Sequence, residues 1–182
     1  MKIYVTGLGV VSGIGLGVAE NIASLRKHQH GMGKVTLFPT ELDVPVSEVK
    51  YSNEELKRLL SLDIQKTFSR TALLGMLAAR EAVDDARLDL NTLRVGLISS
   101  TSVGGMDLSE HFYNAFKKDN RKGRLREVIS HDCGASTEMI ADYLKVNDFV
   151  TTISTARSSA ANAIMLGARM IRNGQLDAAI VG

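Results

Sequence analysis

The chain has 182 residues, enough for one hydrophobic core or for part of a larger one. Hydrophobic residues make up 45% of it, and 22 Lys and Arg against 20 Asp and Glu leave a formal net charge of +2. This balance argues against nucleic-acid binding, and the lack of a run of about 18 apolar residues argues against a membrane span.

Strand-like and helical patterns alternate from the first residues onward. Residues 3–11, IYVTGLGVV, are a β-branched apolar run with two glycines, which predicts a strand that leads into a tight turn. Residues 17–27 repeat apolar side chains at three-to-four spacing, which is typical of a short amphipathic helix. Residues 28–50 lack a dominant period and contain both prolines of the chain, so we expect an excursion over the surface.

The middle of the chain contains the longest helical pattern. Ser52 and Glu55 form a capping-box sequence and predict a helix over the residues that follow. The pattern over 67–88 predicts a long helix, whose acidic cluster we interpret as its solvated face and not as paired catalytic carboxylates. Residues 94–101 predict a buried strand, and a further helix is expected to start near Gly105.

The last third continues the alternation. Helices are predicted over 135–145 and 157–173, and strands over 149–155 and 177–182. Residues 160–171 are almost all small or apolar, which is the pattern of a helix buried on every side. Alternating strands and helices predict an α/β architecture with a largely parallel sheet.

The glycines of TGLGVVSGIGLG, residues 6–17, raise the question of a nucleotide site, because they follow a predicted strand. Read from Gly7, the pattern is G-x-G-x-x-S, with Ser12 where the dinucleotide fingerprint has its third glycine. No second strand that ends in an acidic residue follows about 20 residues later. We therefore favour a tight strand-to-helix turn over a nucleotide-binding domain.

The segment STARSSAANA, residues 154–163, resembles an active-site elbow between a strand and a helix. The start of a buried helix presents unpaired N–H groups and the positive end of its dipole. Such a place favours a thiolate or an oxyanion. Arg157 stands there instead, and a guanidinium in a buried position would need an acidic or carbonyl partner to offset its desolvation.

The same segment resembles the nucleophile region of the β-ketoacyl-acyl carrier protein synthases, the condensing enzymes of fatty acid and polyketide synthesis. TTISTARSSAANAIMLGARMIRNGQLDAAIVG, residues 151–182, is similar to their T-A-C motif followed by small residues, an alanine-rich helix, N-G and a D-x-A strand. IYVTGLGVVSGIG and RVGLISSTSVGGM match in the same order. The likeness covers essentially the whole chain and is weakest over residues 28–60.

This resemblance implies a thiolase-like fold of two stacked α/β halves. Residues 1–182 would be the N-terminal half only, with a sheet of mixed strands, helices on both faces and a buried central helix at 157–173. The C-terminal half, which carries the catalytic histidines and lysine of the family, would be absent and the domain incomplete. The family cysteine, which takes the acyl chain before condensation with malonyl carrier, would stand at Arg157. Arginine cannot replace a thiol, so this chain is predicted to be inactive as given.

Two interpretations stay open. The chain is either a fragment or altered product of a condensing enzyme, or a non-catalytic partner of an active synthase, comparable to the chain-length factors of polyketide systems. Both imply acyl carrier protein as a partner and a homodimer or heterodimer with a related synthase subunit, without nucleic acid, membrane, metal or cofactor. The strand over 149–155 would pair across a two-fold axis, and bare apolar surface predicts a dimer, a larger assembly or aggregation.

The resemblance also implies a set of acyl-pocket positions at the start of the helix after RVGLISSTSVGGM. Cys133 would approach this pocket and the dimer partner. A partly buried cysteine is favoured over a thiol activated by His131, because adjacent residues rarely point at a common substrate atom. The substrate-binding positions implied are Gly104, Gly105, Met106, Ser109 and Cys133.

Other polar residues are given structural roles. Ser158 and Ser159 are expected to cap or pack, since no histidine is assigned near them. His28 and His30 would need another ligand to bind a metal. A solvated loop is favoured over an acidic partner for one basic cluster. Its members are Lys117, Lys118, Arg121, Lys122, Arg124 and Arg126.

The cysteine content and the N-terminal sequence bear on the compartment. A single cysteine excludes an internal disulfide framework and fits a reducing environment. The opening MKIYVTGLGVV lacks the basic segment, apolar core and cleavage site of a signal peptide. The sequence therefore predicts a cytoplasmic location.

Overall fold

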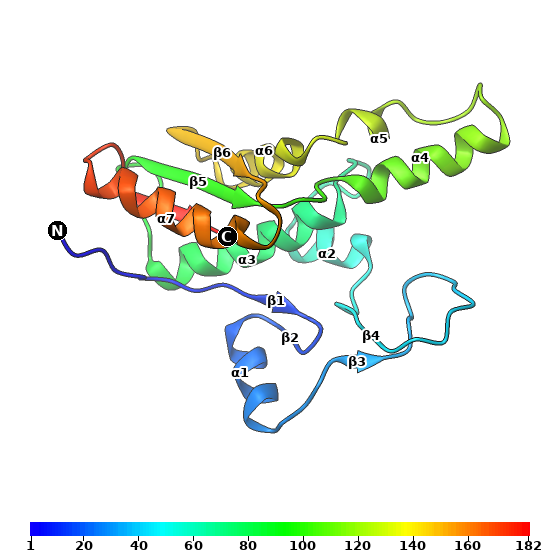
Figure 1. Ribbon diagram of the computed structural model, residues 1–182, viewed down its shortest axis with the longest axis horizontal. Helices are drawn as coiled ribbons and strands as arrows, with labels where there is room; N and C mark the ends of the chain where they lie inside the picture. The colour runs from blue at the N-terminus through cyan, green and yellow to red at the C-terminus, as the bar shows by residue number, and fades with distance from the viewer.

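A three-stranded parallel sheet forms the centre of the molecule. The computed structural model describes residues 1–182. β5 (Val95–Ser100) lies between β6 (Phe149–Ile153) and β7 (Ala178–Val181), so the strand order is β6-β5-β7 (Figure 1). The three strands predicted in this part of the sequence are confirmed.

All strand pairs of this sheet are parallel. Leu97 in the middle of β5 stands beside Val150 of β6 and Ile180 of β7. Each connection between these strands contains a helix, which allows parallel pairing. The mixed strand directions expected from the resemblance are therefore not found within this sheet. Antiparallel pairs occur only outside it, between β1 (Val11–Ser12) and β2 (Gly15–Leu16) and between β3 (Met32–Gly33) and β4 (Val46–Ser47).

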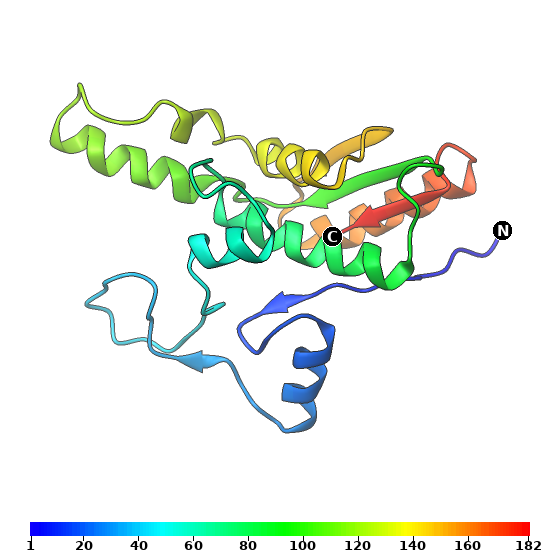
Figure 2. The ribbon, with the colours of Figure 1, turned by 180° about the vertical axis from the view of Figure 1, so that it is seen from behind.

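Helices cover both faces of the sheet, as predicted. α3 (Arg70–Ala86) and α6 (Cys133–Leu144) lie on one face, and α7 (Ser159–Arg172) lies on the other (Figures 1 and 2). The larger of two apolar clusters lies between the sheet and the first two of these helices, and it includes Met76 and Leu97. None of the helices is both long enough and apolar enough to span a membrane.

The capping box forms as predicted, and it begins α2 (Asn53–Leu59). The Glu55 amide donates to the Ser52 hydroxyl at 3.2 Å, and the Glu55 carboxylate accepts from the Ser52 amide at 2.7 Å. The bonds from Ser52, its backbone amide first, lower the pKa of the Glu55 carboxyl. The cap fixes the direction of α2, and this direction places Leu56 in the larger core.

The N-terminal segment, residues 1–10, runs beside α3 without joining a sheet, so the strand predicted for this part of the sequence is wrong. Its amides bond to carboxylates of α3 instead. The Leu8 N–H donates to Asp85 and the Val10 N–H to Glu81, both at 3.0 Å. The segment does not pair with the free edge of β7, which has β5 as its one strand neighbour. The acidic face of α3, predicted to be merely solvated, therefore anchors this segment.

Close approach of this segment to α3 depends on a glycine. A Cβ atom at Gly9 would lie only 1.8 Å from the carbonyl oxygen of Ala78, a distance that no side chain allows. The chain then passes through β1 and β2 into α1 (Val18–Arg26), the short helix predicted there. Residues 28–50 contain only the short strands β3 and β4, in agreement with the predicted excursion.

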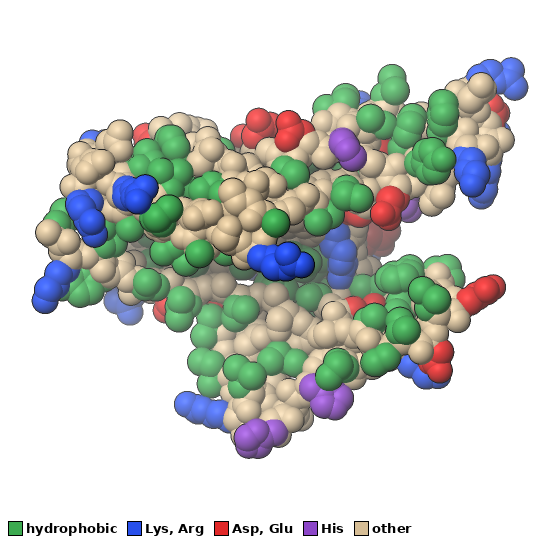
Figure 3. Space-filling view, in the orientation of Figure 1, with side chains coloured by type: hydrophobic (Ala, Val, Ile, Leu, Met, Phe, Trp, Pro, Cys, Tyr) green, Lys and Arg blue, Asp and Glu red, His purple; other side chains and the backbone are tan.

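An arm projects from the body of the molecule (Figure 1). It consists of residues 106–129, with α4 (Met106–Lys118) and the short α5 (Arg126–Ile129) packed on each other. Neither helix contains a buried residue. Figure 3 shows hydrophobic side chains spread over the arm and basic ones at its tip.

The helix predicted to be buried on all sides is buried on one side only. α7 begins at Ser159, after a short turn, and packs Ala163, Gly167 and Met170 against the sheet. Its outer face is open, with Ile164 55% and Met165 44% exposed. The expected buried central helix is therefore corrected to a half-exposed one, because within these 182 residues no second layer covers its outer face.

Candidate functional site

The strand, turn and helix of the predicted elbow are all present. β6 ends at Ile153, a 3-10 turn spans Ala156–Ser158, and α7 begins at Ser159. We call residues 154–162 the elbow. Arg157 occupies the middle of its turn.

The backbone of the elbow is bent at Ala156. This residue has a φ of 53°, in the left-handed region that costs a non-glycine residue about 1 kcal/mol or more. Thr155 before it has a φ of −126°, so the direction of the chain changes sharply between the two residues. Arg157 therefore follows directly after a bend in the backbone and belongs to neither β6 nor α7.

Hydroxyl groups close the turn. The Ser159 hydroxyl accepts from the Thr155 amide at 2.9 Å and donates to the Ala156 carbonyl at 2.7 Å. The Ser158 hydroxyl bonds to the Thr155 carbonyl at 3.0 Å. The Asn162 side-chain amide donates to the Thr155 hydroxyl at 2.9 Å. These bonds give Ser158 and Ser159 structural roles within the turn, but no side-chain hydrogen bond caps the start of α7, so the predicted capping role is wrong.

Arg157 does not lie deep in the molecule, which corrects the expectation for this position. Its side chain is exposed and takes part in none of the four ion pairs of the protein. The outer face of α7 and the elbow share this exposure, because no further layer packs there. Water therefore solvates the guanidinium, and it needs no acidic partner to offset burial.

The predicted acyl-pocket positions come together where the arm joins the body. Gly104 has a φ of 57°, and a Cβ there would lie 2.8 Å from the Cα of Cys133. Gly105 is the N-cap of α4, so Met106 begins that helix on the neighbouring residue. The glycine pair thus allows the starts of α4 and α6 to touch.

A polar pair strengthens this junction. The Ser109 hydroxyl of α4 lies 2.9 Å from Nδ1 of His131, just before α6. One turn into α6, the Thr137 hydroxyl bonds to that of Thr152 in β6 at 2.6 Å. These are two separate bonds, one between α4 and the residue before the cap of α6 and one between α6 and β6, and no hydrogen bond joins the pocket positions to Arg157.

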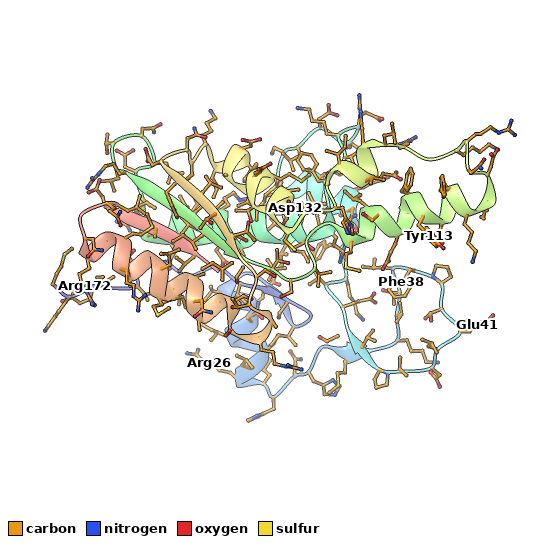
Figure 4. All side chains as sticks on the ribbon, turned by 45° about the horizontal axis from the view of Figure 1, so that its top comes forward. Arg26, Phe38, Glu41, Tyr113, Asp132 and Arg172 are labelled. Carbon is orange, nitrogen blue, oxygen red and sulfur yellow. The ribbon has the colours of Figure 1, made fainter.

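Cys133 and His131 are neighbours in sequence but are not bonded to each other. The His131 ring bonds to Ser109, while Cys133 is the first residue of α6 and partly exposed. Asp132 caps that helix by accepting from the Gly134 amide at 2.9 Å (Figure 4). This arrangement agrees with a structural cysteine. No three His, Cys, Asp or Glu side chains are placed to hold a metal ion.

The basic cluster, interpreted from the sequence as a solvated loop, lies on the arm. Lys117 and Lys118 end α4, on which Phe116 stacks on Phe112 at 5.7 Å between ring centroids. Tyr113 of the same helix is 60% exposed (Figure 4), and Arg124 lies just before α5, which Arg126 begins. Arg121 and Lys122 are paired with Asp119, at 3.4 and 3.7 Å. The other four cations form no ion pair: Lys117, Lys118, Arg124 and Arg126. In the sequence, a helical pattern over 106–118 that ends in basic residues indicates a helix with a positively charged end.

Known proteins resemble this chain along its whole length. The family described as "Beta-ketoacyl synthase, N-terminal domain" matches residues 1–182. The 3-oxoacyl-[acyl-carrier-protein] synthase 2 of Staphylococcus aureus (strain MRSA252) is 27% identical over 191 residues, with 100% of this chain and 45% of that protein covered. The corresponding synthase of Vibrio harveyi is 28% identical over 197 residues, again with 45% of its length covered. The chain thus spans about half the length of these relatives.

Solved structures also resemble this chain. "The ishigamide ketosynthase/chain length factor" superposes with a TM-score of 0.86 at 28% identity, covering 98% of this chain and 46% of that one. A structure titled as a type II acyl-carrier protein in complex with its ketosynthase, AntDE:AntF, has a TM-score of 0.70 at 21% identity, covering 94% of this chain and 42% of the other. The likeness confirms the thiolase-like fold expected from the sequence.

Proposed function

Because the chain belongs to the β-ketoacyl synthase family, as its N-terminal domain, we propose that it is the elbow-bearing half of a 3-oxoacyl-acyl carrier protein synthase-like protein of fatty acid or polyketide synthesis. The observation that carries this proposal is the elbow itself: parallel strand, left-handed residue, turn, and a 14-residue helix. A reactive side chain at position 157 would stand next to the start of that helix, where an anion is stabilised.

The proposed chemistry of thiol-bearing relatives has two parts. The enzyme thiol gives up its proton and attacks, as a thiolate, the carbonyl carbon of an acyl thioester; the carbon–sulfur bond to the carrier breaks, and the carrier sulfur leaves and takes up that proton. Malonyl carrier then loses carbon dioxide, and its carbanion attacks the enzyme-bound acyl carbon and releases the thiolate. Neither part can begin at Arg157, because a guanidinium remains protonated and has no nucleophilic electron pair. This chain is therefore proposed to be inactive in acyl transfer.

Intact mass after incubation with a short acyl thioester tests the proposal. The natural chain should gain no acyl group, whereas the Arg157→Cys variant should gain one, located at position 157 by peptide mapping. Cys133→Ser added to both proteins serves as the control for acylation elsewhere. Acylation of the natural chain at Cys133, or failure of the Arg157→Cys variant to acylate while folded, would contradict the assignment.

A non-catalytic partner role is the second candidate. The structure named for a ketosynthase and chain length factor is 28% identical to this chain with a TM-score of 0.86. A cationic side chain at the elbow suits such a subunit, which needs the fold and not the thiol. Co-expression with a thiol-bearing synthase tests this role, and a stable heterodimer by mass photometry supports it. Exclusive recovery of separate proteins would eliminate it.

The proposed partner of the basic cluster is acyl carrier protein, an acidic protein. Lys117 and Lys118 form no ion pair and end the helix that carries exposed Tyr113 and Phe116, and the unpaired Arg124 and Arg126 follow on the same arm. Complementary charge speeds encounter and weakens with salt. The double variant Lys118→Glu, Arg124→Glu should bind an acidic carrier protein at least about tenfold more weakly by fluorescence anisotropy, which corresponds to about 1.4 kcal/mol.

The double variant Arg169→Glu, Arg172→Glu is the matched control, because it lowers the net charge by the same four units at exposed cations in the last turn of α7. Arg172 is an exposed cation at the end of α7, far from the arm (Figure 4). These reversals change the net charge without touching the arm, so binding should change less than about twofold. Equal losses for both proteins would mean that overall charge, and not the basic cluster, binds the carrier.

A further inference from the structure

The turn of the elbow is held by one buried hydroxyl. Ser159 is only 5% exposed, and its hydroxyl makes two bonds on opposite sides of the left-handed residue. It accepts from the Thr155 amide at 2.9 Å and donates to the Ala156 carbonyl at 2.7 Å. The same atom therefore satisfies a donor before the bend and an acceptor after it, which no other side chain of the elbow does.

The other polar side chains of the elbow are placed differently. Ser158 is exposed, and its hydroxyl donates toward Thr155, at 3.0 Å to the carbonyl and 3.1 Å to the side chain, and accepts from the Asn162 side-chain amide at 3.4 Å. Asn162 reaches the Thr155 hydroxyl at 2.9 Å, again before the bend. Water can replace these exposed bonds more readily than those of the Ser159 hydroxyl, because the Ser159 side chain is buried.

We propose that Ser159 is a positioning residue: its hydroxyl keeps Ala156 left-handed and so fixes the side chain at position 157 beside the first turn of α7. This inference rests on the proposed function, in which position 157 carries the reactive group. Loss of the hydroxyl removes the partner of the Thr155 amide and one of the two donors to the Ala156 carbonyl, which also accepts from the Ser159 amide. The turn then relaxes to an ordinary conformation, and the side chain at 157 moves away from the start of the helix.

A thiol at position 157 reports this geometry. The parent protein for the test carries Arg157→Cys and Cys133→Ser, so that it has a single thiol. Its alkylation rate with iodoacetamide is measured against pH, since only the thiolate reacts. We expect a midpoint at least about one pH unit below the ordinary thiol value of about 8.5.

Adding Ser159→Ala should raise that midpoint toward the ordinary value and slow alkylation at pH 7 by about threefold to tenfold. Ser159→Thr keeps a hydroxyl and should retain the parent profile. Ser158→Ala removes an exposed hydroxyl from the same turn and should change the rate by less than about twofold. Superimposable profiles for the parent and Ser159→Ala, or equal shifts for Ser158→Ala and Ser159→Ala, would overturn the proposal.

A second variant covers the case in which Ser159→Ala folds poorly by circular dichroism. Ala156→Gly removes the steric cost of the left-handed conformation, so Ala156→Gly with Ser159→Ala should recover folding and most of the low-pH reactivity. If this variant folds but its alkylation rate still lacks the low-pH midpoint of the parent, Ser159 does not position residue 157 by way of Ala156. Iodoacetamide needs neither carrier nor acyl pocket, so this test can succeed while acylation by a thioester fails, and the reverse.

Discussion

At the scale of single residues, an ion pair ties the starts of β5 and β7 together. Arg94 donates to both oxygens of Asp177, at 3.0 Å from Nε and 2.7 Å from Nη2, and its backbone amide donates as well. These bonds, the side-chain bond first, lower the pKa of Asp177 to about 2. Because the folded pKa is depressed, the pair stabilises the protein above the unfolded pKa of about 3.9 and loses this effect as pH falls toward 2.

The Asp177→Asn variant tests this linkage. Urea unfolding should show it less stable than the natural protein at pH 7, with the difference shrinking between about pH 4 and pH 2 as Asp177 is protonated. Glu54→Gln is the control, because the Glu54 pair with Arg58 is exposed and 3.9 Å long. A difference between Asp177→Asn and the natural protein that stays constant with pH would contradict the assignment.

At the scale of elements, α3 contacts and supports two separate parts of the chain. Its apolar face contributes to the main core, and its acidic face binds the N-terminal segment through Glu81 and Asp85. Glu81 is the more important anchor, because it accepts from the Val10 amide at 3.0 Å and from the Val18 amide at 2.7 Å. Its carboxylate therefore joins the segment before β1 to the start of α1.

Glu81→Ala should release this anchor. We expect a loss of about 1.5–3 kcal/mol, the usual effect of hydrogen bonds to a charged group, and faster amide exchange at Val10 and Val18. Asp84→Ala is the matched control, since Asp84 lies on the same helix, is exposed and accepts no described side-chain bond. Hydrogen exchange with mass spectrometry checks both, and equal exchange in the two variants would remove the anchoring role.

Elements whose structure is decided by neighbouring residues could be predicted from the sequence. Features that depend on contacts with distant parts of the chain could not. The capping box of α2 and the strand-turn-helix of the elbow follow from neighbouring residues. The apolar circumference of α7 indicates burial, but only packing decides which face is covered, and Ile164 is 55% exposed. Likewise, IYVTGLGVV is strand-like, yet its amides bond to the carboxylates of α3, which no local pattern indicates. The two bonds of Ser159 depend on φ at Ala156, which no residue pattern specifies.

At the scale of the whole molecule, apolar surface is left without a covering layer. β7 has one strand neighbour, so the backbone groups of Ala179 and Val181 that point away from β5 are unpaired. On the outer face of α7, Ile164 and Met165 are 55% and 44% exposed. Such surfaces favour association between molecules.

Light scattering with size-exclusion chromatography should therefore show mass that rises with concentration. The double variant Ile164→Glu, Met165→Glu should shift the protein toward monomer by placing charge on the open face of α7. Gln175→Glu, Asn173→Glu adds the same charge at exposed positions outside that face and should leave the association unchanged. A natural protein that stays monomeric at all concentrations would contradict this prediction.

The pairing of β7 with the central strand also sets the order in which the fold can be completed. Arg94 and Asp177, which join the two strands, are 83 residues apart in sequence. Contacts of such separation carry a large loop-closure cost and form late, while helices such as α3 can form locally and early. On a ribosome, β5 would emerge well before its partner and remain with an open edge on that side. A slow folding step, and a dependence on chaperones during synthesis, follow from this topology.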